Sequence, residues 1–271
     1  MSKTLYISDL DGTLLNSSQR ISEKSSRIIN NLVEKGMTFS YATARSVYTA
    51  RKAAAGLTAK IPLIVYNGAF IVDNITMERI AVNVLTDDEA KHIYNTLTNG
   101  GVYPIVYSLI DNIEKFSYDT LTLSRGLSDF IVTRKGDFRD RPLAGNRDIL
   151  LGNKFYFTCI DSAEKLAPIY NSLKSEFNCC FQTDIYSSEH WLEIMPAAAT
   201  KANAILQLKN ILGCDRVVSF GDAVNDITMA KISDEFYAVG NAVDELKSLA
   251  SAVIGCNDND GVAEWLLENY I

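Results

Sequence analysis

Residues 4–73 alternate between apolar runs and amphipathic stretches, and this alternation constrains the fold more than any other feature of the sequence. Apolar, β-rich runs cover 4–10, 37–45 and 61–73, and helix-like stretches lie between them. The order strand, helix, strand, helix, strand predicts a parallel sheet with helices on its faces. The pattern returns at about residue 200, where a helix-like run precedes the strand "RVVSFGDAVND". We therefore predict an α/β fold, with a Rossmann-like parallel sheet core and helices on both faces.

The segment 84–194 interrupts this alternation. It begins with a helix-like run and continues with strands such as "VYPIVYS" and "NKFYFTCI", without the βαβ order. We predict an inserted α+β domain over 84–194, built on a mostly antiparallel sheet, and a core formed by 1–83 and 195–271. A basic run at 134–147 has no periodicity. It predicts a solvated loop, and contact with an anionic leaving group is the alternative.

Composition and charge exclude several classes of protein. A chain of 271 residues with 47% hydrophobic and 22% charged residues is typical of a soluble globular protein with up to two domains. The net charge of −7 argues against nucleic acid as a partner. No apolar run approaches the ~20 residues of a membrane span, and the N-terminus lacks a signal-peptide pattern. The five cysteines form no CxxC pair. We expect a cytoplasmic monomer or weak homodimer with no membrane partner.

Two acids stand at the end of the first apolar run, "LYISDLDGTLL" at 5–15. Because side chains alternate along a strand, we expect Asp9 and Asp11 to project from the same side. Two close carboxylates repel each other unless a cation lies between them or one takes a proton. In an open parallel sheet, ligands bind beyond the carboxyl ends of the strands. The pair therefore predicts a site at that edge.

Polar residues also follow the other predicted strands of the core. The second strand ends in Thr43 and Arg45, the third in Asn67 and Gly68, and "RVVSFGD" in Asp222. Asn225 and Asp226 follow Asp222 within four residues, and Lys201 lies at the start of the helix-like run that precedes this strand. Oxygen ligands without cysteine or histidine describe a hard divalent ion such as Mg²⁺, which uses one or two carboxylates together with phosphate and water. Hydroxyl and ammonium groups can hold phosphate oxygens, and a carboxylate beside Mg²⁺ can attack phosphorus.

These motifs resemble one known superfamily. "DLDGTLL", the threonine of "YATAR", the lysine of "PAAATKANAI" and "GDAVNDITM" occur in the order typical of haloacid dehalogenase (HAD) superfamily phosphatases. The long insertion, together with "YNGA", "VGNA" and "NDNDGVAEWL", resembles the Cof-type sugar phosphatases. The resemblance implies that the inserted domain is a cap. It also implies a phosphatase that acts on a small phosphate ester such as a sugar phosphate, with Mg²⁺ as cofactor.

The resemblance also implies roles for individual residues. Asp9 would be the nucleophile and a Mg²⁺ ligand. Asp11 would be the general acid and base, and would bind the metal through its backbone carbonyl. Asp222 would complete the protein ligands of the metal. Thr43 and Lys201 would hold the phosphoryl oxygens.

Further positions have supporting roles. Asn225 would approach the phosphate. Asp226 would support the metal or Lys201 from outside the first layer of residues around the substrate. Arg45 is an open case between a substrate contact and a surface charge, and Asn67 with Gly68 would face the substrate. Ala44 departs from the family pattern, which usually has glycine here, but its amide could still contact phosphate unless a positive φ is required.

Two other functions remain open at this point. A phosphomutase would use the same acids and return the phosphoryl group to the sugar. A non-catalytic, phospho-accepting regulatory protein also pairs acids with a threonine and a lysine, but such modules are about half this length and lack an inserted domain. The acidic run "NDNDG" at 257–261 lacks the glutamate of a calcium loop and predicts a loop and helix cap.

Overall fold

The computed structural model describes residues 3–183 and 189–270. The chain divides into two compact units, a core unit that runs to Val82 and resumes at Ala199, and the inserted unit Asn83–Ala198. The sequence places these boundaries after residues 83 and 194. Met195 pairs with Asn178 in the sheet of the inserted unit, so that sheet continues past 194.

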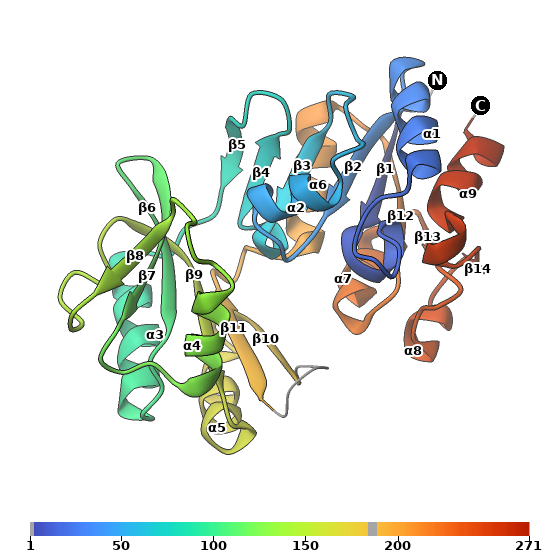
Figure 1. The fold of residues 1–271 in the computed structure, drawn as a ribbon. Coiled ribbons are helices and arrows are strands. Elements are labelled where there is room, and N and C mark those ends of the chain that lie inside the picture. Colours follow the sequence, from blue (N-terminus) through green and yellow to red (C-terminus); the bar gives the residue numbers. More distant parts are fainter. Residues whose placement is uncertain (1–2, 184–188, 271) are drawn as a thin grey trace. The chain divides into compact units, whose positions relative to one another are not determined.

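The core unit is built on an eight-stranded sheet whose order is β14-β13-β12-β1-β2-β3-β4-β5 (Figure 1). The six strands from β14 to β3 run parallel, and β4 and β5 are antiparallel additions at one edge. The bounds are β1 Thr4–Asp9, β2 Thr38–Ala42, β3 Pro62–Val65, β4 Phe70–Asp73, β5 Arg79–Val82, β12 Arg216–Gly221, β13 Glu235–Ala238 and β14 Ala252–Val253. The central position of β1 puts its carboxyl end between those of β12 and β2.

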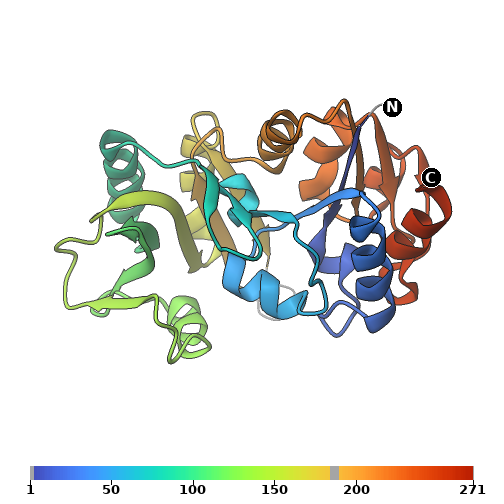
Figure 2. The ribbon, with the colours of Figure 1, turned by 90° about the horizontal axis from the view of Figure 1, so that it is seen from above.

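Helices cover both faces of this sheet (Figure 2). On one face, Ile205 of α6 and Met229 of α7 pack on Ile7 of β1. On the other, Trp265 of α9 packs on Tyr6 and Phe220, and α1 lies beside α9. The helices are α1 Glu23–Glu34, α2 Val47–Ala53, α6 Lys201–Leu212, α7 Ile227–Ile232, α8 Asp244–Lys247 and α9 Gly261–Asn269, with short turns η1 Leu10–Leu14, η2 Tyr66–Gly68, η3 Val224–Asp226 and η4 Asn257–Asn259. This agrees with the predicted α/β core.

Local chemistry explains where the helices around the site begin. The Thr200 hydroxyl accepts a hydrogen bond from the Asn203 N–H at 3.0 Å and so caps α6, which starts at Lys201. Ser46 caps α2 in the same way, through the N–H of Thr49. Each cap lies a few residues beyond the end of a strand, Ser46 after β2 and Thr200 after β11 (His190–Met195).

The inserted unit has its own sheet, of order β10-β11-β9-β6-β7-β8. All its pairings are antiparallel except that of β7 with β8, as expected for a mostly antiparallel α+β unit. Side chains of α3 and α5 form its apolar core with one face of the sheet. The bounds are α3 Asp87–Asn99, β6 Ile105–Ile110, β7 Ile113–Asp119, α4 Arg125–Val132, β8 Asp140–Leu143, β9 Asn153–Asp161, α5 Ala163–Leu173, β10 Asn178–Thr183 and β11 His190–Met195.

The basic run at 134–147 differs from the predicted solvated loop. It contains β8, and the Arg139 side chain is buried. Its guanidinium pairs with Glu114 at 2.5 Å and with Asp137 at 2.6 Å. A buried arginine requires such partners, and its charge therefore supports the structure of the inserted unit. In the described part of the chain, no helix is both long and apolar enough to cross a membrane.

Candidate active site

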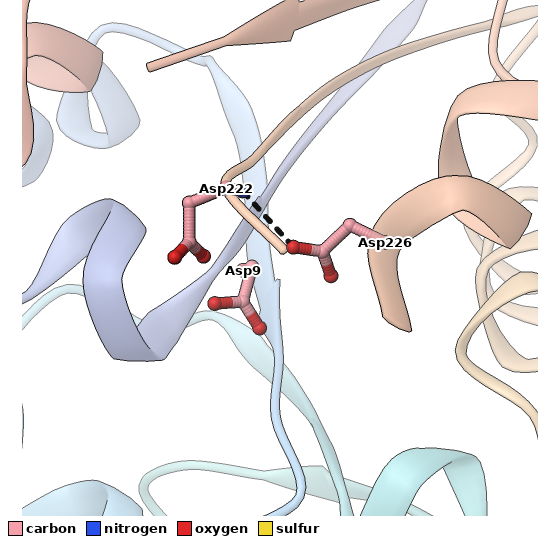
Figure 3. Close-up of side chains that lie close together, drawn as sticks. All are labelled: Asp9, Asp222 and Asp226. Carbon is pink, nitrogen blue, oxygen red and sulfur yellow. Dashed lines mark hydrogen bonds between the residues drawn. The ribbon is translucent and has the colours of Figure 1, made fainter. Parts of the chain in front are cut away.

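Three carboxylates gather at the carboxyl ends of the neighbouring parallel strands β1 and β12 (Figure 3). Asp9 is the last residue of β1, Asp222 follows β12, and Asp226 ends the short turn η3. One carboxylate oxygen from each lies within 4.8 Å of the others. The three side chains converge because the two strands are paired in register up to Ser8 and Phe220. Asp222 and Asp226, far from Asp9 in the sequence, thus reach it across a single strand pair.

Lys201 supplies the positive charge of this cluster. Its ammonium group, buried at the start of α6, donates to Asp9 Oδ1 and, at 2.8 Å, to Asp226 Oδ1. Burial alone would lower the pKa of Lys201, but the Asp226 and Asp9 carboxylates outweigh it and raise that pKa, so the lysine stays charged. Three carboxylates against one ammonium leave an excess of negative charge at this end of the sheet.

Asp226 supports the site through hydrogen bonds to its neighbours. Its side chain is fully buried, and Oδ2 accepts from the Asp222 N–H at 3.1 Å and from the Ala223 N–H at 3.2 Å. With Lys201 on Oδ1, both of its oxygens are already engaged. Gly221 allows this close approach, because a Cβ there would lie 2.7 Å from the Asp226 Cβ. Asp226 therefore orients Lys201 and the Asp222 backbone. Asp9 and Asp222 are better placed than Asp226 to bind an ion.

The environment of these two acids suits a cation. Burial, reinforced by the nearby Asp226 charge, raises the pKa of Asp9 well above its ordinary value although Lys201 opposes this. Burial also raises the pKa of Asp222 to about 6, although the Thr13 hydroxyl donates to its Oδ1 at 2.9 Å. Among the described residues, no donor contacts Asp9 Oδ2 or Asp222 Oδ2. A buried and a half-buried carboxylate with available oxygens are the hard donors that Mg²⁺ prefers, so the residues present fit that ion.

Gly12 is required for this arrangement. Its φ is +76°, and a Cβ at this position would lie 2.3 Å from Asp222 Oδ2. The turn after β1 therefore packs its backbone directly against the Asp222 carboxylate. Only glycine combines this conformation with this contact.

Asp11 lies outside the three-acid cluster. The strand β1 ends at Asp9 and the chain turns through η1, so the alternation of a strand does not extend to Asp11. Its carboxylate is exposed and accepts from Arg45 Nε at 3.0 Å and 2.9 Å. Arg45 also donates to Gln19 Oε1 at 3.1 Å. Asp11, predicted as the general acid and base, thus forms an ion pair with Arg45, the predicted substrate contact.

The ends of β2 and β3 bring further predicted residues to the same edge. Thr43 is buried, follows the strand position that pairs with Asp9, and accepts the Arg45 N–H on Oγ1 at 3.1 Å. Its carbonyl accepts the Asn67 N–H at 2.9 Å. Gly68, at φ +100°, would place a Cβ 2.3 Å from the Thr200 carbonyl. The turn at 66–68 therefore packs against the residue that precedes Lys201.

Two other predicted residues, Ala44 and Asn225, are exposed beside this cluster. Sequence reasoning missed Thr13, which holds Asp222, and Gln19, which holds Arg45. The only signal for Thr13 was its place in "DLDGTLL", and no periodicity or motif pointed to Gln19.

Comparison with known proteins is consistent with this geometry. A family model described as haloacid dehalogenase-like hydrolase matches residues 6–266. A 5-amino-6-(5-phospho-D-ribitylamino)uracil phosphatase of Bacillus subtilis, YwtE, is 29% identical over 278 residues, covering 95% of each chain. An HMP-PP phosphatase of Serratia proteamaculans is 26% identical, covering 95% of this chain and 92% of that protein.

Solved structures show the same fold. A haloacid dehalogenase-like hydrolase from Bacteroides thetaiotaomicron superposes with a TM-score of 0.79 at 24% identity, covering 99% of this chain and 100% of that one. A haloacid dehalogenase-like hydrolase from B. subtilis gives 0.78 at 21% identity, covering 98% and 99%. The predicted family resemblance and fold class are confirmed.

Proposed function

Because this chain belongs to the haloacid dehalogenase-like hydrolases, we propose that it is a Mg²⁺-dependent phosphomonoesterase that acts on small phosphorylated metabolites through an aspartyl-phosphate on Asp9. The family confirms the predicted enzyme class, a hydrolase. The observation that carries the finer proposal is the Asp9, Asp222, Asp226 and Lys201 cluster, with its excess of negative charge and its two available carboxylate oxygens.

In this proposal Asp9 and Asp222 would hold the metal, together with the Asp11 carbonyl. Bound Mg²⁺ would screen the repulsion between the anionic nucleophile and the anionic ester. Lys201 donates to Asp9 Oδ1 and so restrains the orientation of the nucleophilic carboxylate. Asp9 attacks, an Asp9–phosphorus bond forms, and the bond from phosphorus to the leaving oxygen breaks.

The proton transfers fall to Asp11. Protonated Asp11 gives its proton to the leaving oxygen and then takes one from the water that attacks the phosphorus of phospho-Asp9. The bond from phosphorus to Asp9 breaks, inorganic phosphate leaves, Asp9 is again a carboxylate and Asp11 is again protonated. An acid that donates a proton cannot remain paired as an anion with Arg45. We therefore infer that the pair separates when substrate binds, and that Arg45 then contacts the phosphate or the sugar. Thr43, the Ala44 amide and Asn225 would contact the phosphoryl oxygens, and Asn67 with Gly68 the substrate.

The substrate class rests on the relatives. The B. subtilis relative named above acts on a 5-phospho-ribityl compound and the Serratia relative on HMP-PP. Their substrates differ, and what they share is a small molecule that carries phosphate. We propose a phosphate ester of a sugar or sugar alcohol, hydrolysed in the cytoplasm by a monomer or weak homodimer, with the inserted unit acting as a cap that contacts the leaving group.

A phosphomutase or a phospho-accepting regulator would use similar acids, so the tests must separate them. Wild-type protein with Mg²⁺ should release inorganic phosphate from a panel of sugar phosphates, ranked by kcat/KM. Formation of an isomer without phosphate release would indicate a mutase, and a stable phosphoprotein without turnover would indicate a regulator.

The nucleophile is tested by Asp9→Asn, which keeps the size of the side chain. The variant should lose turnover of a generic aryl phosphate and unfold with the same cooperativity as the wild type. Asp258→Asn, at an exposed acid bonded to Ser17, serves as the matched control and should retain full turnover. Wild-type turnover by Asp9→Asn would falsify the mechanism.

A further inference from the structure

One segment of the core unit touches both loops that carry the proposed metal ligands. Residues 239–243, "VGNAV", follow β13 and lead to α8, and we call them the strap. None of these residues belongs to the acidic cluster. The strap nevertheless makes backbone or side-chain hydrogen bonds to the chain on either side of that cluster.

The strap holds the Asp222 loop through its two ends. The Val239 N–H donates to the Gly221 carbonyl at 3.2 Å, and the Val243 N–H donates to the Asp222 carbonyl at 2.9 Å. Asp222 is therefore fixed to the strap through its own backbone.

Asn241, in the middle of the strap, holds the turn that follows Asp9. Its Nδ2 donates to the Gly12 carbonyl at 2.7 Å, and its Oδ1 accepts the Asn257 N–H at 3.0 Å. Asn257 in turn donates from Nδ2 to the Leu15 carbonyl at 3.0 Å. Both polar atoms of the Asn241 amide are thus engaged. Asn257, which orients this side chain, also forms a hydrogen bond to the same turn.

These bonds close a ring through the site. Gly12 packs against the Asp222 carboxylate, and Thr13 donates to it. The turn after β1, the loop after β12 and the strap are therefore each joined to the other two. A ring of this kind fixes the distance between the ends of β1 and β12, which carry Asp9 and Asp222.

We propose that Asn241 is a positioning residue for the metal site: by gripping Gly12 it sets the spacing of the Asp9 and Asp222 carboxylates at which Mg²⁺ is bound. The inference rests on the proposed function. It assigns Asn241 no contact with metal or substrate. Its side chain is exposed, so it adds little apolar packing, and its bonds act mainly on where the Asp9 turn lies.

The test is Mg²⁺ binding measured by titration calorimetry on the wild type and on Asn241→Ala, together with the rise in Tm that Mg²⁺ produces. Loss of a residue that orients metal ligands typically weakens the metal by about 10- to 100-fold, and we expect a loss in that range. With Mg²⁺ raised to saturation, the variant should recover most of the wild-type kcat. Asn241→Ser makes the same test if the alanine variant does not fold.

Two control variants separate positioning from general stability. Asn269→Ala removes an exposed amide that donates to the Trp265 carbonyl at 2.8 Å, a bond of the same kind at the end of α9. Asn257→Ala removes the bond to Leu15 but keeps the Asn257 backbone N–H on Asn241 and the Asn241–Gly12 bond. Both should bind Mg²⁺ within about twofold of the wild type, since neither frees Gly12.

The outcomes are distinct. If Asn241→Ala binds Mg²⁺ as tightly as Asn269→Ala does, the positioning role is overturned even though the phosphatase proposal stands. If the wild type itself neither binds Mg²⁺ nor turns over any phosphate ester, the proposed function fails and this inference fails with it. A loss confined to Asn241→Ala supports the role.

Discussion

Replacement of Asp222 by asparagine should stabilise the metal-free protein at pH 8 and at the same time remove its stabilisation by Mg²⁺. Burial raises the pKa of Asp222 from 3.8 to about 6, so the ionised side chain costs the fold free energy. A group whose pKa is raised by folding makes a contribution to the free energy of unfolding that depends on pH. That contribution is complete below the unfolded pKa and is lost as the pH rises through the folded pKa. Asparagine keeps the size and the acceptor for Thr13 but carries no charge.

The size of the effect follows from the shift. A raised pKa of this size, about 2 above the ordinary value, corresponds to a gain in stability of about 3 kcal/mol for Asp222→Asn at pH 8. The gain falls to roughly half at pH 5, where much of Asp222 is protonated. Wild-type protein in Mg²⁺ at about 100 times Kd should gain about 2.7 kcal/mol, which the variant should lack.

The assay is denaturant unfolding of the two proteins in EDTA and in Mg²⁺, at pH 5 and pH 8. Asp258→Asn is the control of opposite sign, because the Ser17 hydroxyl and N–H lower the pKa of Asp258 and its neutralisation should bring no gain. An Asp222→Asn protein that is less stable than the wild type in EDTA at pH 8, or that gains equally from Mg²⁺, would refute the reasoning.

Three further changes test other parts of the site. Lys201→Met should destabilise the metal-free protein by about 3–5 kcal/mol at pH 8, because it leaves Asp9 and Asp226 buried without a cation. Chemical unfolding measures the loss of stability, and a loss of under about 1 kcal/mol would contradict the prediction. Gly12→Ala should cost about 1–3 kcal/mol from its positive φ and weaken Mg²⁺ binding in calorimetry through the contact with Asp222, and unchanged affinity would argue against that contact. Arg45→Ala should lower kcat/KM for a sugar phosphate by about tenfold or more, as expected for a lost charge-assisted contact, whereas Arg51→Ala, whose guanidinium contacts Met77, should not.

Strand patterns predicted the parts of the fold that depend on burial alone. The alternation in residues 4–73 located β1, α1, β2, α2 and β3, because buried parallel strands have long apolar runs whatever surrounds them. The sequence did not predict α4 and β8. Arg125–Val132 is a short helix in which Leu127 is the buried residue, and β8 is a four-residue edge strand in a basic run. Such short elements depend on partners such as Glu114, which no local pattern reveals.

The strand ends predicted the acidic cluster for a topological reason. Asp9 and Asp222 end strands that are neighbours in a parallel sheet, so their proximity follows once the sheet is inferred. Asp11 shows where this argument stops. It lies two residues past the last strand residue that the alternation governs, and its position depends on the turn η1 and on Arg45. The contacts of Thr13, Gln19 and Asn241 were not predicted for the same reason, since each of these residues acts through hydrogen bonds formed between loops.

The imbalance of charge connects the chemistry of this site to its stability. A nucleophilic carboxylate must be ionised to attack phosphorus, yet burial and the Asp226 charge raise the pKa of Asp9 and so favour its protonated form. Lys201 offsets only part of this, because it is shared with Asp226. A divalent cation between Asp9 and Asp222 would favour the ionised form of both. The fold is therefore expected to gain stability, and Asp9 its nucleophilic form, in the same step of metal binding, which makes the Mg²⁺ dependence of Tm a direct measure of how far the site is prepared for catalysis.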